Sequence, residues 1–357
     1  MNRNKKSAIA VLLIISLFIL AAASGCSSQN GTAQAPKNQT LTEPISKSEF
    51  LLDTMCKISV YDNVSPEVID KGFDKLKEVD ARMNADSETS EIADINSHAG
   101  LDYVKVSDET FYVIKEGKQY GDTTHGRFDI TIGPLVKLWG INTDHARVPA
   151  PEEIKEKLPL VDYHNILLDE ANKKVMLTNK GMALDLGGIA KGYSADAVAE
   201  VLKKNGVEHA IINLGGNVLV MGSKPGGEDW KVGIQNPLAE RGEYMGIVHV
   251  SDKAVVTSGI YERFFEQDGK RYHHILDTNT GYPVDNSLAG VTIVTDKSID
   301  GDALAKAFCM GVEEGLKFIE AQKNAEAIFV TKDSKVYVTP GIKKSFEITD
   351  ASFTLMN

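Results

Sequence analysis

The stretch over residues 183–193, A-L-D-L-G-G-I-A-K-G-Y, constrains the fold of this chain more than any other. It follows a strand-like run and leads into a helical pattern that we expect over residues 192–204. Glycines at such a turn allow close packing between helices. They also allow an anion to bind at the helix N-terminus, where free N–H groups and the helix dipole favour negative charge. Both interpretations stay open, because the spacing matches neither the phosphate loop with Gly-Lys-Ser/Thr nor the G-x-G-x-x-G fingerprint.

Apolar periodicity along the remaining chain predicts a mixture of helices and strands. Helices are expected from Ser65-Pro66, where the following apolar residues are three or four apart, and over residues 107–120 and 303–321. Strands are expected over residues 50–61, 210–214, 247–250, 254–257, 290–294, 328–330 and 336–338, with a hairpin over 166–177. Residues 141–163 are polar and contain prolines, which predicts a surface excursion. Helices and strands do not alternate regularly, and this favours an α+β fold over a doubly wound sheet.

The first 26 residues have the features of an export signal. Arg3, Lys5 and Lys6 precede an apolar run over residues 8–23, which is shorter than the roughly 20 apolar residues of a spanning helix. The sequence A-S-G-C then ends at Cys26 and resembles the lipobox of bacterial lipoproteins, although a plain secretory signal is the alternative. We therefore expect a signal peptide at 1–25, a lipidated flexible tether at 26–46 and a body at 47–357, on the extracytoplasmic face of the membrane.

Composition excludes several classes of protein. The hydrophobic fraction of 42% is sufficient for a buried core. Acidic residues outnumber basic ones by 50 to 39, which argues against nucleic acid as a partner because phosphate contacts need clustered Lys and Arg. With Cys26 lipidated, Cys56 and Cys309 are expected to be core thiols rather than a disulfide. A G-x-S-x-G elbow is absent from the sequence, so serine hydrolase chemistry is set aside.

Three further segments are denser in Gly, Asp and Thr than connecting loops usually are. They are G-R-F-D-I-T-I-G-P from Gly126, N-L-G-G-N from Asn213, and T-S-G from Thr257, which leads to Y-H-H-I-L-D-T-N-T-G-Y-P and then to D-G-D-A-L from Asp300. Each one alone is compatible with a turn or an Asx cap. The adjacent histidines lack the H-x-x-x-H or C-x-x-C spacing of a zinc site. A hard cation such as Mg²⁺, held by carboxylate, carbonyl and phosphate oxygens, fits better.

Together these segments resemble one family. Six motifs have the order and spacing that are typical of the ApbE family, the FAD:protein FMN transferases. They are F-D-I-T-I-G-P-L, D-L-G-G-I-A-K-G-Y, I-N-L-G-G-N, T-S-G, H-I-L-D-T-N-T-G-Y-P and D-A-L-A. The resemblance spans residues 51–338 and is pronounced for the lipoprotein flavinylators of Gram-positive bacteria that serve extracellular electron transfer. It implies a two-lobed α+β body of mixed and antiparallel sheets with packed helices, and a ligand cleft between the lobes.

The resemblance also implies a reaction. FMN would be transferred from FAD to a Thr or Ser hydroxyl of an acceptor protein, with release of AMP and a requirement for Mg²⁺. The acceptors of the family carry a motif of the type D-G-A-[ST]-[GA], and no such motif is evident in this chain. An FAD pyrophosphatase, in which water replaces the acceptor, is an alternative. A flavin-binding lipoprotein without catalysis is another.

Individual residues take their expected roles from the same resemblance. Asp302 is expected to bind Mg²⁺ and to help activate the acceptor hydroxyl, and Gly188 to offer the metal a backbone carbonyl. His274 is expected to hydrogen-bond the pyrophosphate or the leaving AMP, so Asp302 and His274 are the predicted catalytic residues. The predicted FAD site consists of Leu52, Asp129, Ile130, Thr131, Asp185, Lys191, Ser258, Gly259, His274 and Ile275.

Two positions depart from the pattern of the family. Leu52-Asp53-Thr54 stands where Met-Gly-Thr is usual, so Leu52 would keep only an apolar contact with the ligand. Lys306 follows Asp302 by four residues, where D-A-L-[ST]-T supplies a threonine that ligates the metal. A protonated ammonium cannot ligate a metal but can neutralise phosphate. Lys306 is therefore expected to replace the role of one ligand, with Asp300 or water completing the coordination.

Overall fold

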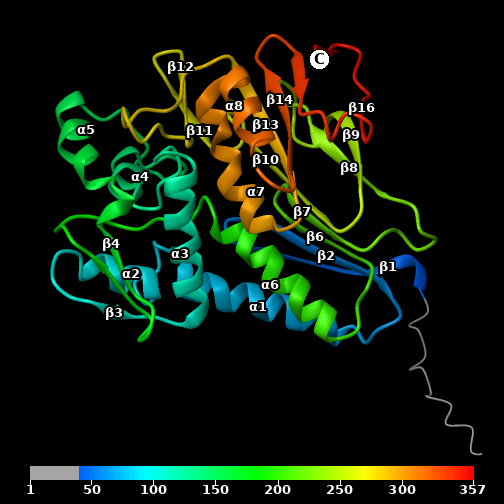
Figure 1. Cartoon of the computed structure of the whole chain (residues 1–357), viewed down its shortest axis with the longest axis horizontal. Coiled ribbons are helices and arrows are strands. Elements are labelled where there is room, and N and C mark those ends of the chain that lie inside the picture. The colour runs from blue at the N-terminus through cyan, green and yellow to red at the C-terminus, as the bar shows by residue number, and fades with distance from the viewer. Residues whose placement is uncertain (1–39) are drawn as a thin grey trace, which may run out of the picture. The chain divides into compact units, whose positions relative to one another are not determined.

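A nine-stranded sheet is the framework of the computed structural model, which describes residues 40–357 (Figure 1). The predicted signal peptide, Cys26 and residues 26–39 of the predicted tether lie outside the described residues. Every neighbouring pair of strands is antiparallel except the last, β15 and β17, which is parallel. The strand order is β1 (Thr40–Leu51), β2 (Thr54–Asp62), β6 (Ala210–Leu214), β7 (Asn217–Met221), β10 (Lys253–Gly259), β13 (Leu288–Thr295), β14 (Ala325–Thr331), β15 (Lys335–Val338) and β17 (Thr354–Leu355).

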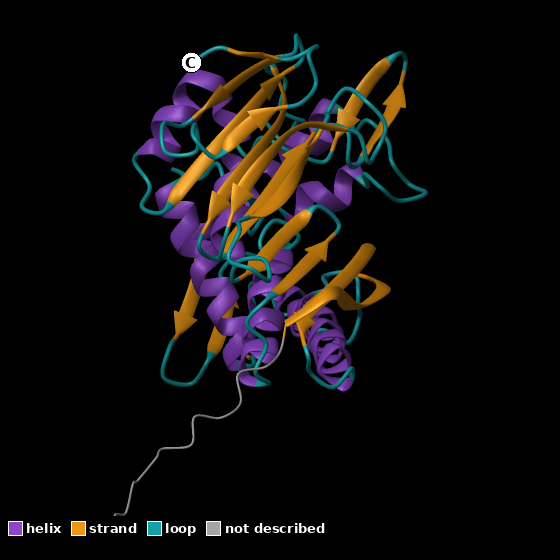
Figure 2. Cartoon of the chain, turned by 90° about the vertical axis from the view of Figure 1, so that its right-hand side faces the viewer, coloured by secondary structure: helices purple, strands orange, loops and turns teal. Residues whose placement is uncertain are grey.

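Both faces of the central strands are covered, which explains why β13 is buried along its whole length. Val291 and Ile293 pack towards α7 (Ser298–Leu304) and α8 (Gly311–Glu320). Val294, on the opposite face, packs against a second sheet. That sheet has the order β16 (Phe346–Ile348), β9 (Tyr244–Val250), β8 (Trp230–Gln235). This mixture of helices and largely antiparallel strands confirms the predicted α+β fold (Figure 2).

The other end of the sheet is covered by two predicted helices, α1 (Glu67–Met83) and α6 (Ala190–Lys204), which contact each other. The predicted apolar stripe of α1 is buried, as its spacing requires: Ile69, Phe73 and Leu76 pack against β2 and β6, and the end of the stripe, Val79 and Met83, packs into a neighbouring core. A third region, next to α6, consists of α2 (Glu91–Ser97), α3 (Asp108–Thr123) and a small sheet of β3 (Val104–Lys105), β5 (Lys174–Leu177) and β4 (Ile166–Asp169). The predicted hairpin over residues 166–177 is thus confirmed as β4 and β5.

The strand β1 corrects the predicted extent of the tether. Residues 40–46 were expected to be flexible because they are mostly polar, yet they belong to β1, which pairs with β2. An edge strand is held by its main-chain hydrogen bonds and needs few apolar side chains. Here Ile45 and Leu51 pack against the core beneath α1.

The single helix predicted over residues 303–321 is also wrong. The chain forms α7, a 3₁₀ segment (Ala305–Met310) and then α8. Gly311 lies between the last two with φ 74° and ψ −172°, a backbone conformation that is open mainly to glycine. Asp302 therefore lies inside α7, and Lys306 lies on the 3₁₀ segment.

The predicted surface excursion over residues 141–163 has more structure than expected. It contains α5 (Pro151–Lys157) and a 3₁₀ turn (Leu158–Leu160), a second 3₁₀ turn (Tyr163–Asn165) begins at its last residue, and Ile154 and Tyr163 are buried. It follows α4 (Gly133–Trp139), whose Trp139 is fully buried. None of the helices within residues 40–357 is long and apolar enough to span a membrane. Cys56 is buried, Cys309 is half-buried, and both are free thiols.

Helices α6 and α7 approach each other so closely that only glycine fits at the contact. A Cβ atom on Gly192 would lie 2.4 Å from the Ser298 carbonyl oxygen and 2.7 Å from the Cα of Ile299. Asp196, one turn further along α6, accepts hydrogen bonds from the backbone N–H groups of Ser298 (2.8 Å) and Ile299 (2.9 Å). The start of α7 is thus fixed to α6.

This contact predicts the effect of Gly192→Ala. Alanine favours helices, but here its methyl group would collide with the backbone of α7, which cannot rotate away as a side chain can. We expect a loss of about 2 kcal/mol or more in the free energy of unfolding, measured by urea denaturation. The control is Lys203→Ala on the exposed face of α6, which should change stability by less than about 0.5 kcal/mol. Equal stability of Gly192→Ala and the unsubstituted protein would contradict the close contact.

Candidate active site

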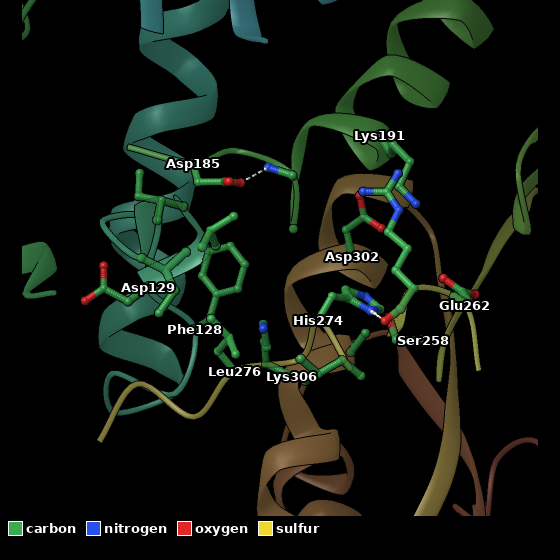
Figure 3. A pocket seen from close by; sticks show the side chains of 18 of the residues that line it. Phe128, Asp129, Asp185, Lys191, Ser258, Glu262, His274, Leu276, Asp302 and Lys306 are labelled. Atoms are coloured by element: carbon green, nitrogen blue, oxygen red, sulfur yellow. Dashed lines mark hydrogen bonds between the residues drawn. The ribbon is translucent and has the colours of Figure 1, made fainter. Parts of the chain in front are cut away.

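Most of the predicted site residues line one cavity of about 180 Å³ (Figure 3). Segments that are far apart in the sequence form its walls: the loop before α4, the glycine turn before α6, the end of β10, the residues after β12 (Lys270–His273), and α7 with the 3₁₀ segment that follows. The predicted residues in the lining are Asp129, Ile130, Asp185, Gly188, Lys191, Ser258, His274, Ile275, Asp302 and Lys306.

Two of the predicted motifs lie side by side and form one wall. The N–H of Asp185 donates to the carbonyl of Ile130 (2.8 Å), and Ile132 forms a parallel bridge with Ala183. The side chain of Asn96 donates to the Leu184 carbonyl (3.0 Å) and accepts from the Leu184 N–H (2.6 Å). The glycine turn is therefore held from both sides before α6 begins.

Asp302 is held by one hydrogen bond to each carboxylate oxygen. The Gly192 N–H donates to Oδ2 (2.5 Å), and Nδ2 of Asn217 donates to Oδ1 (3.0 Å). Burial raises the pKa of Asp302, while Lys191 and these two hydrogen bonds oppose the rise. Each oxygen keeps one further lone pair, so the carboxylate can still accept a hydroxyl proton or contact a cation.

This contact changes the expected role of the helix N-terminus. Of the first N–H groups of α6, that of Ala190 donates to the Leu186 carbonyl (2.8 Å) and that of Gly192 to Asp302. The anion at the start of the helix is thus a carboxylate of the protein itself. Close helix packing, the other interpretation of the turn, is also observed at Gly192. An incoming phosphate would consequently depend mainly on side chains for its positive partners.

Three cations that line the cavity can supply them. Lys191 is the second residue of α6, Lys306 lies on the 3₁₀ segment and Arg263 precedes β11 (Phe264–Gln267). Within residues 40–357, none of the three forms an ion pair with a carboxylate, whereas Arg127, also in the lining, pairs with Glu314 (3.0 Å). Unpaired cations that converge on one cavity favour an anionic ligand with several charged oxygens.

His274 is the one of the two adjacent histidines that lines the cavity. His274 faces the cavity, and burial together with nearby Lys306 and Arg263 lowers its pKa to about 3, so the ring is neutral. Its Nδ1 lies 3.3 Å from the carbonyl oxygen of Arg263, which can only accept, so we assign the proton to Nδ1. Nε2 then has a free lone pair, which can accept a hydrogen bond from a hydroxyl or amino group. In this tautomer Nε2 cannot donate to a phosphate oxygen.

Three predicted FAD-site residues do not line this cavity. Thr131 is fully buried and donates to Asp129, and Gly259 lies beneath the ring of Tyr261. Leu52 lines a larger adjoining groove of about 1360 Å³, which shares Asp185 and Lys191 with the cavity.

Two further carboxylates have hydrogen-bond partners within the protein. Asp129 accepts from the Thr131 N–H (2.7 Å) and the Tyr163 N–H (2.9 Å), so its carboxylate is occupied within the protein although the residue lines the cavity. Asp300, expected to complete a metal site, is absent from the lining and instead accepts from the Tyr120 hydroxyl (2.7 Å). Asp300 therefore does not share the cavity with Asp302, because this side of α7 faces α3, and of the two expected donors this leaves water to complete the coordination.

Several lining residues were not predicted from the sequence. Phe128 and Trp139 provide an apolar wall, Arg263 adds a cation, and Asn217 contacts Asp302. Phe128 belongs to the segment that we singled out from Gly126, so the motif could have indicated it, whereas Trp139 lies five residues beyond the end of that segment. Asn217 ends the motif N-L-G-G-N, but its partner is 85 residues away in the sequence and leaves no local signal.

A divalent cation fits the donors in this cavity only together with a ligand. Among residues 40–357 no group of three or more His, Cys, Asp or Glu side chains could enclose a metal ion. Asp302 supplies carboxylate oxygens, and Gly188, whose carbonyl the family resemblance assigns to the metal, also lines the cavity. Mg²⁺ is commonly bound by one or two carboxylates plus the phosphates of a substrate, and this donor set agrees with that pattern.

Comparison with known proteins gives consistent matches along most of the chain. A sequence model of the ApbE family matches residues 52–329 of this chain. An FAD:protein FMN transferase of Klebsiella pneumoniae is 38% identical over 286 residues, which cover 80% of this chain and 89% of that protein. An FAD:protein FMN transferase of Treponema pallidum is 34% identical over 328 residues, which cover 87% and 91%.

Solved structures show the same similarity. The ApbE protein from Thermotoga maritima has a TM-score of 0.79 at 32% identity, and the match covers 85% of this chain and 99% of that chain. The flavin transferase ApbE from Vibrio cholerae has a TM-score of 0.76 at 28% identity, with the same shares covered.

His273 predicts a pH dependence of stability. Its ring is buried, Nε2–H donates to the Val284 carbonyl (2.9 Å), and burial lowers its pKa to about 4. The unfolded chain binds the proton more tightly than the folded chain. The contribution of His273 to the free energy of unfolding is therefore fully present above about pH 6.5 and is lost as the pH drops towards 4. We expect a loss of about 2 kcal/mol from this group between pH 7.5 and pH 5, measured by urea denaturation. His273→Gln should show a smaller loss over the same range, and identical pH profiles would refute the assignment.

Proposed function

The chain belongs to the ApbE family, and we propose that it transfers FMN from FAD to a Thr or Ser hydroxyl of an acceptor protein and releases AMP. One observation carries this proposal. Lys191, His274 and Asp302 come from three separate segments and line one cavity, together with the unpaired cations Lys306 and Arg263. A cavity with these cations, next to a larger groove, suits a ligand with a central pyrophosphate and bulky groups at both ends.

The reaction requires displacement at one phosphorus. The acceptor oxygen forms a new P–O bond to the phosphorus of the FMN half, and the bond from this phosphorus to the oxygen bridging to AMP breaks. The hydroxyl proton is lost from the acceptor, and AMP leaves with the electron pair of the broken bond. Because negative charge builds up on the phosphate oxygens, most of the catalysis consists of positioning and charge neutralisation.

The residues of the cavity divide these tasks. Lys191, Lys306 and Arg263 bind and orient the two phosphates. Asp302 accepts the hydroxyl proton on an oxygen whose orientation the Gly192 and Asn217 hydrogen bonds fix. Burial raises the pKa of Asp302, which makes it a better proton acceptor than an exposed carboxylate. His274 Nε2 accepts a hydrogen bond from a hydroxyl or amino group of the ligand.

The proposal includes a requirement for Mg²⁺. Asp302 and the Gly188 carbonyl would hold the ion, and phosphate oxygens of FAD would complete its coordination. When bound, Mg²⁺ neutralises charge on the phosphates. Lys306 would contribute fixed positive charge on the same side, without acting as a ligand.

The proposed partner and location depend on the sequence. The acceptor is a separate protein with a segment of the type D-G-A-[ST]-[GA], and the enzyme is anchored by a lipid on Cys26 at the extracytoplasmic face of the membrane. The support for the anchor is the A-S-G-C sequence after an apolar run. Nucleic acid is not a proposed partner, because acidic residues predominate in the chain.

Incubation with a peptide tests the function. Purified protein, FAD and Mg²⁺ are mixed with a peptide that contains D-G-A-T-G, and the products are analysed by mass spectrometry and by chromatography of nucleotides. We expect the peptide to gain one FMN on threonine, with one AMP released for each modified peptide. A matched peptide with valine in place of the threonine should stay unmodified.

Asp302→Ala separates catalysis from binding in this assay. The variant should lose AMP formation by about a hundredfold or more and should still quench FAD fluorescence on binding. AMP release from the unsubstituted protein without any peptide would instead identify an FAD pyrophosphatase. FAD binding with no AMP under either condition would identify a flavin-binding protein.

Lys306 predicts a second, independent effect. Removal of an unpaired cation from the phosphate site should lower kcat/KM for FAD about tenfold or more in Lys306→Ala, and Lys306→Arg should retain most of it. The Mg²⁺ concentration for half-maximal rate should rise in the alanine variant. Lys323→Ala removes an exposed lysine that does not line the cavity, and it serves as the control for net charge. Unchanged kinetics of Lys306→Ala would argue against a role in phosphate binding.

A further inference from the structure

We propose that Asn217 is the positioning residue of Asp302: its amide fixes the carboxylate in the orientation that serves FMN transfer. This inference deepens the proposed function and depends on it. Asn217 lies at the start of β7, is only 3% exposed and lines the cavity. No substrate contact is required for its role, because it acts through Asp302.

The hydrogen bonds around Asn217 have only one consistent direction. Nδ2 donates to Oδ1 of Asp302 (3.0 Å), and Oδ1 of Asn217 accepts from the Ser298 hydroxyl (2.6 Å). An ionised carboxylate can only accept, so the amide nitrogen must face Asp302 and the amide oxygen must face Ser298. A flip of the amide would place its oxygen against the Asp302 carboxylate, so the side chain cannot flip without losing the bond to Asp302.

The two partners of this amide lie on one face of the same helix. Ser298 and Asp302 are four residues apart on α7, and residues at this spacing lie one above the other. A single amide from β7 therefore spans one turn of α7. Ser298 is fully buried, and its N–H is held by Asp196 of α6, so the reference point for the amide is rigid.

The carboxylate needs this second contact. The Gly192 N–H holds only Oδ2, and one hydrogen bond leaves the carboxylate free to rotate about its Cβ–Cγ bond. The bond from Asn217 to Oδ1 removes that freedom. The remaining lone pair of each oxygen then points in a fixed direction, as required for a group that must meet a hydroxyl or a cation in one geometry.

The turn before β7 delivers Asn217 to this place. Gly215 and Gly216 have φ values of 66° and 100°, which allow β6 to reverse directly into β7. The N–H of Gly216 donates to Oδ1 of Asn213 (3.0 Å), and Asn217 pairs with Leu214 and with Val256 of β10. The motif N-L-G-G-N thus contains a turn and the residue that the turn positions.

The test compares Asn217→Ala with Ser298→Ala in the full chain. Asn217→Ala frees the carboxylate, and we expect kcat for FMN transfer to fall ten- to a hundredfold, while the Kd for FAD changes less than threefold. Ser298→Ala keeps the bond to Asp302 and removes only its support, so its kcat should fall less. Melting temperatures of both variants report any general loss of stability.

A second readout does not need turnover. The affinity for Mn²⁺ in the presence of FAD, measured by electron paramagnetic resonance of the free ion, should weaken about tenfold in Asn217→Ala. In the background of Asp302→Asn, the further change Asn217→Ala should have no effect on this affinity, because its only route is through Asp302.

Two results would overturn the proposal. One is a kcat and an Mn²⁺ affinity of Asn217→Ala within twofold of the unsubstituted protein. The other is a parallel loss of kcat, FAD binding and melting temperature, which would indicate a purely structural role. Failure of the proposed function would give a different result, because the unsubstituted protein itself would then show no FMN transfer. The Mn²⁺ affinities of Asn217→Ala and the unsubstituted protein would still decide the role of Asn217.

Discussion

The hydrogen bond from the Gly192 amide to Asp302 is the contact on which the site depends. It joins the first turn of α6 to α7, and it forms only because Gly192 has no side chain to separate the two helices. The positive end of the α6 dipole then faces the carboxylate and favours its charged form. Lys191 precedes Gly192 in the chain, so the same contact brings its ammonium group to the cavity that Asp302 lines.

Much of the fold could be predicted because it follows from local patterns. The apolar stripe of α1 and the alternation in β6 reflect burial of one face, which any suitable core imposes. The break at Gly311 could not be foreseen, because apolar periodicity continues on both sides and a glycine inside a helix is often tolerated. Strand β1 was missed for the opposite reason, since the main-chain pairing of an edge strand leaves little trace in its side chains.

The sequence predicted which motifs form the site but not which hydrogen bonds connect their side chains. Resemblance to a family indicated which segments would gather, and residues such as Lys191 and His274 do line one cavity. The partner of each side chain depends on distant segments. Asp300 and Asp302 are two positions apart, yet one faces Tyr120 and the other faces the cavity. Which carboxylate is free for chemistry is decided by the rotation of α7, and this rotation is set by Asp196.

The unpaired cations of the cavity also link the lifetime of the protein to its surroundings. Lys191, Lys306 and Arg263 repel one another when no polyanion lies between them, and a bound dinucleotide removes that repulsion. A ligand that binds only the folded state shifts the folding equilibrium by mass action. A bound flavin dinucleotide would therefore also protect the chain from proteases that cleave its unfolded state, and loss of the ligand would remove this protection.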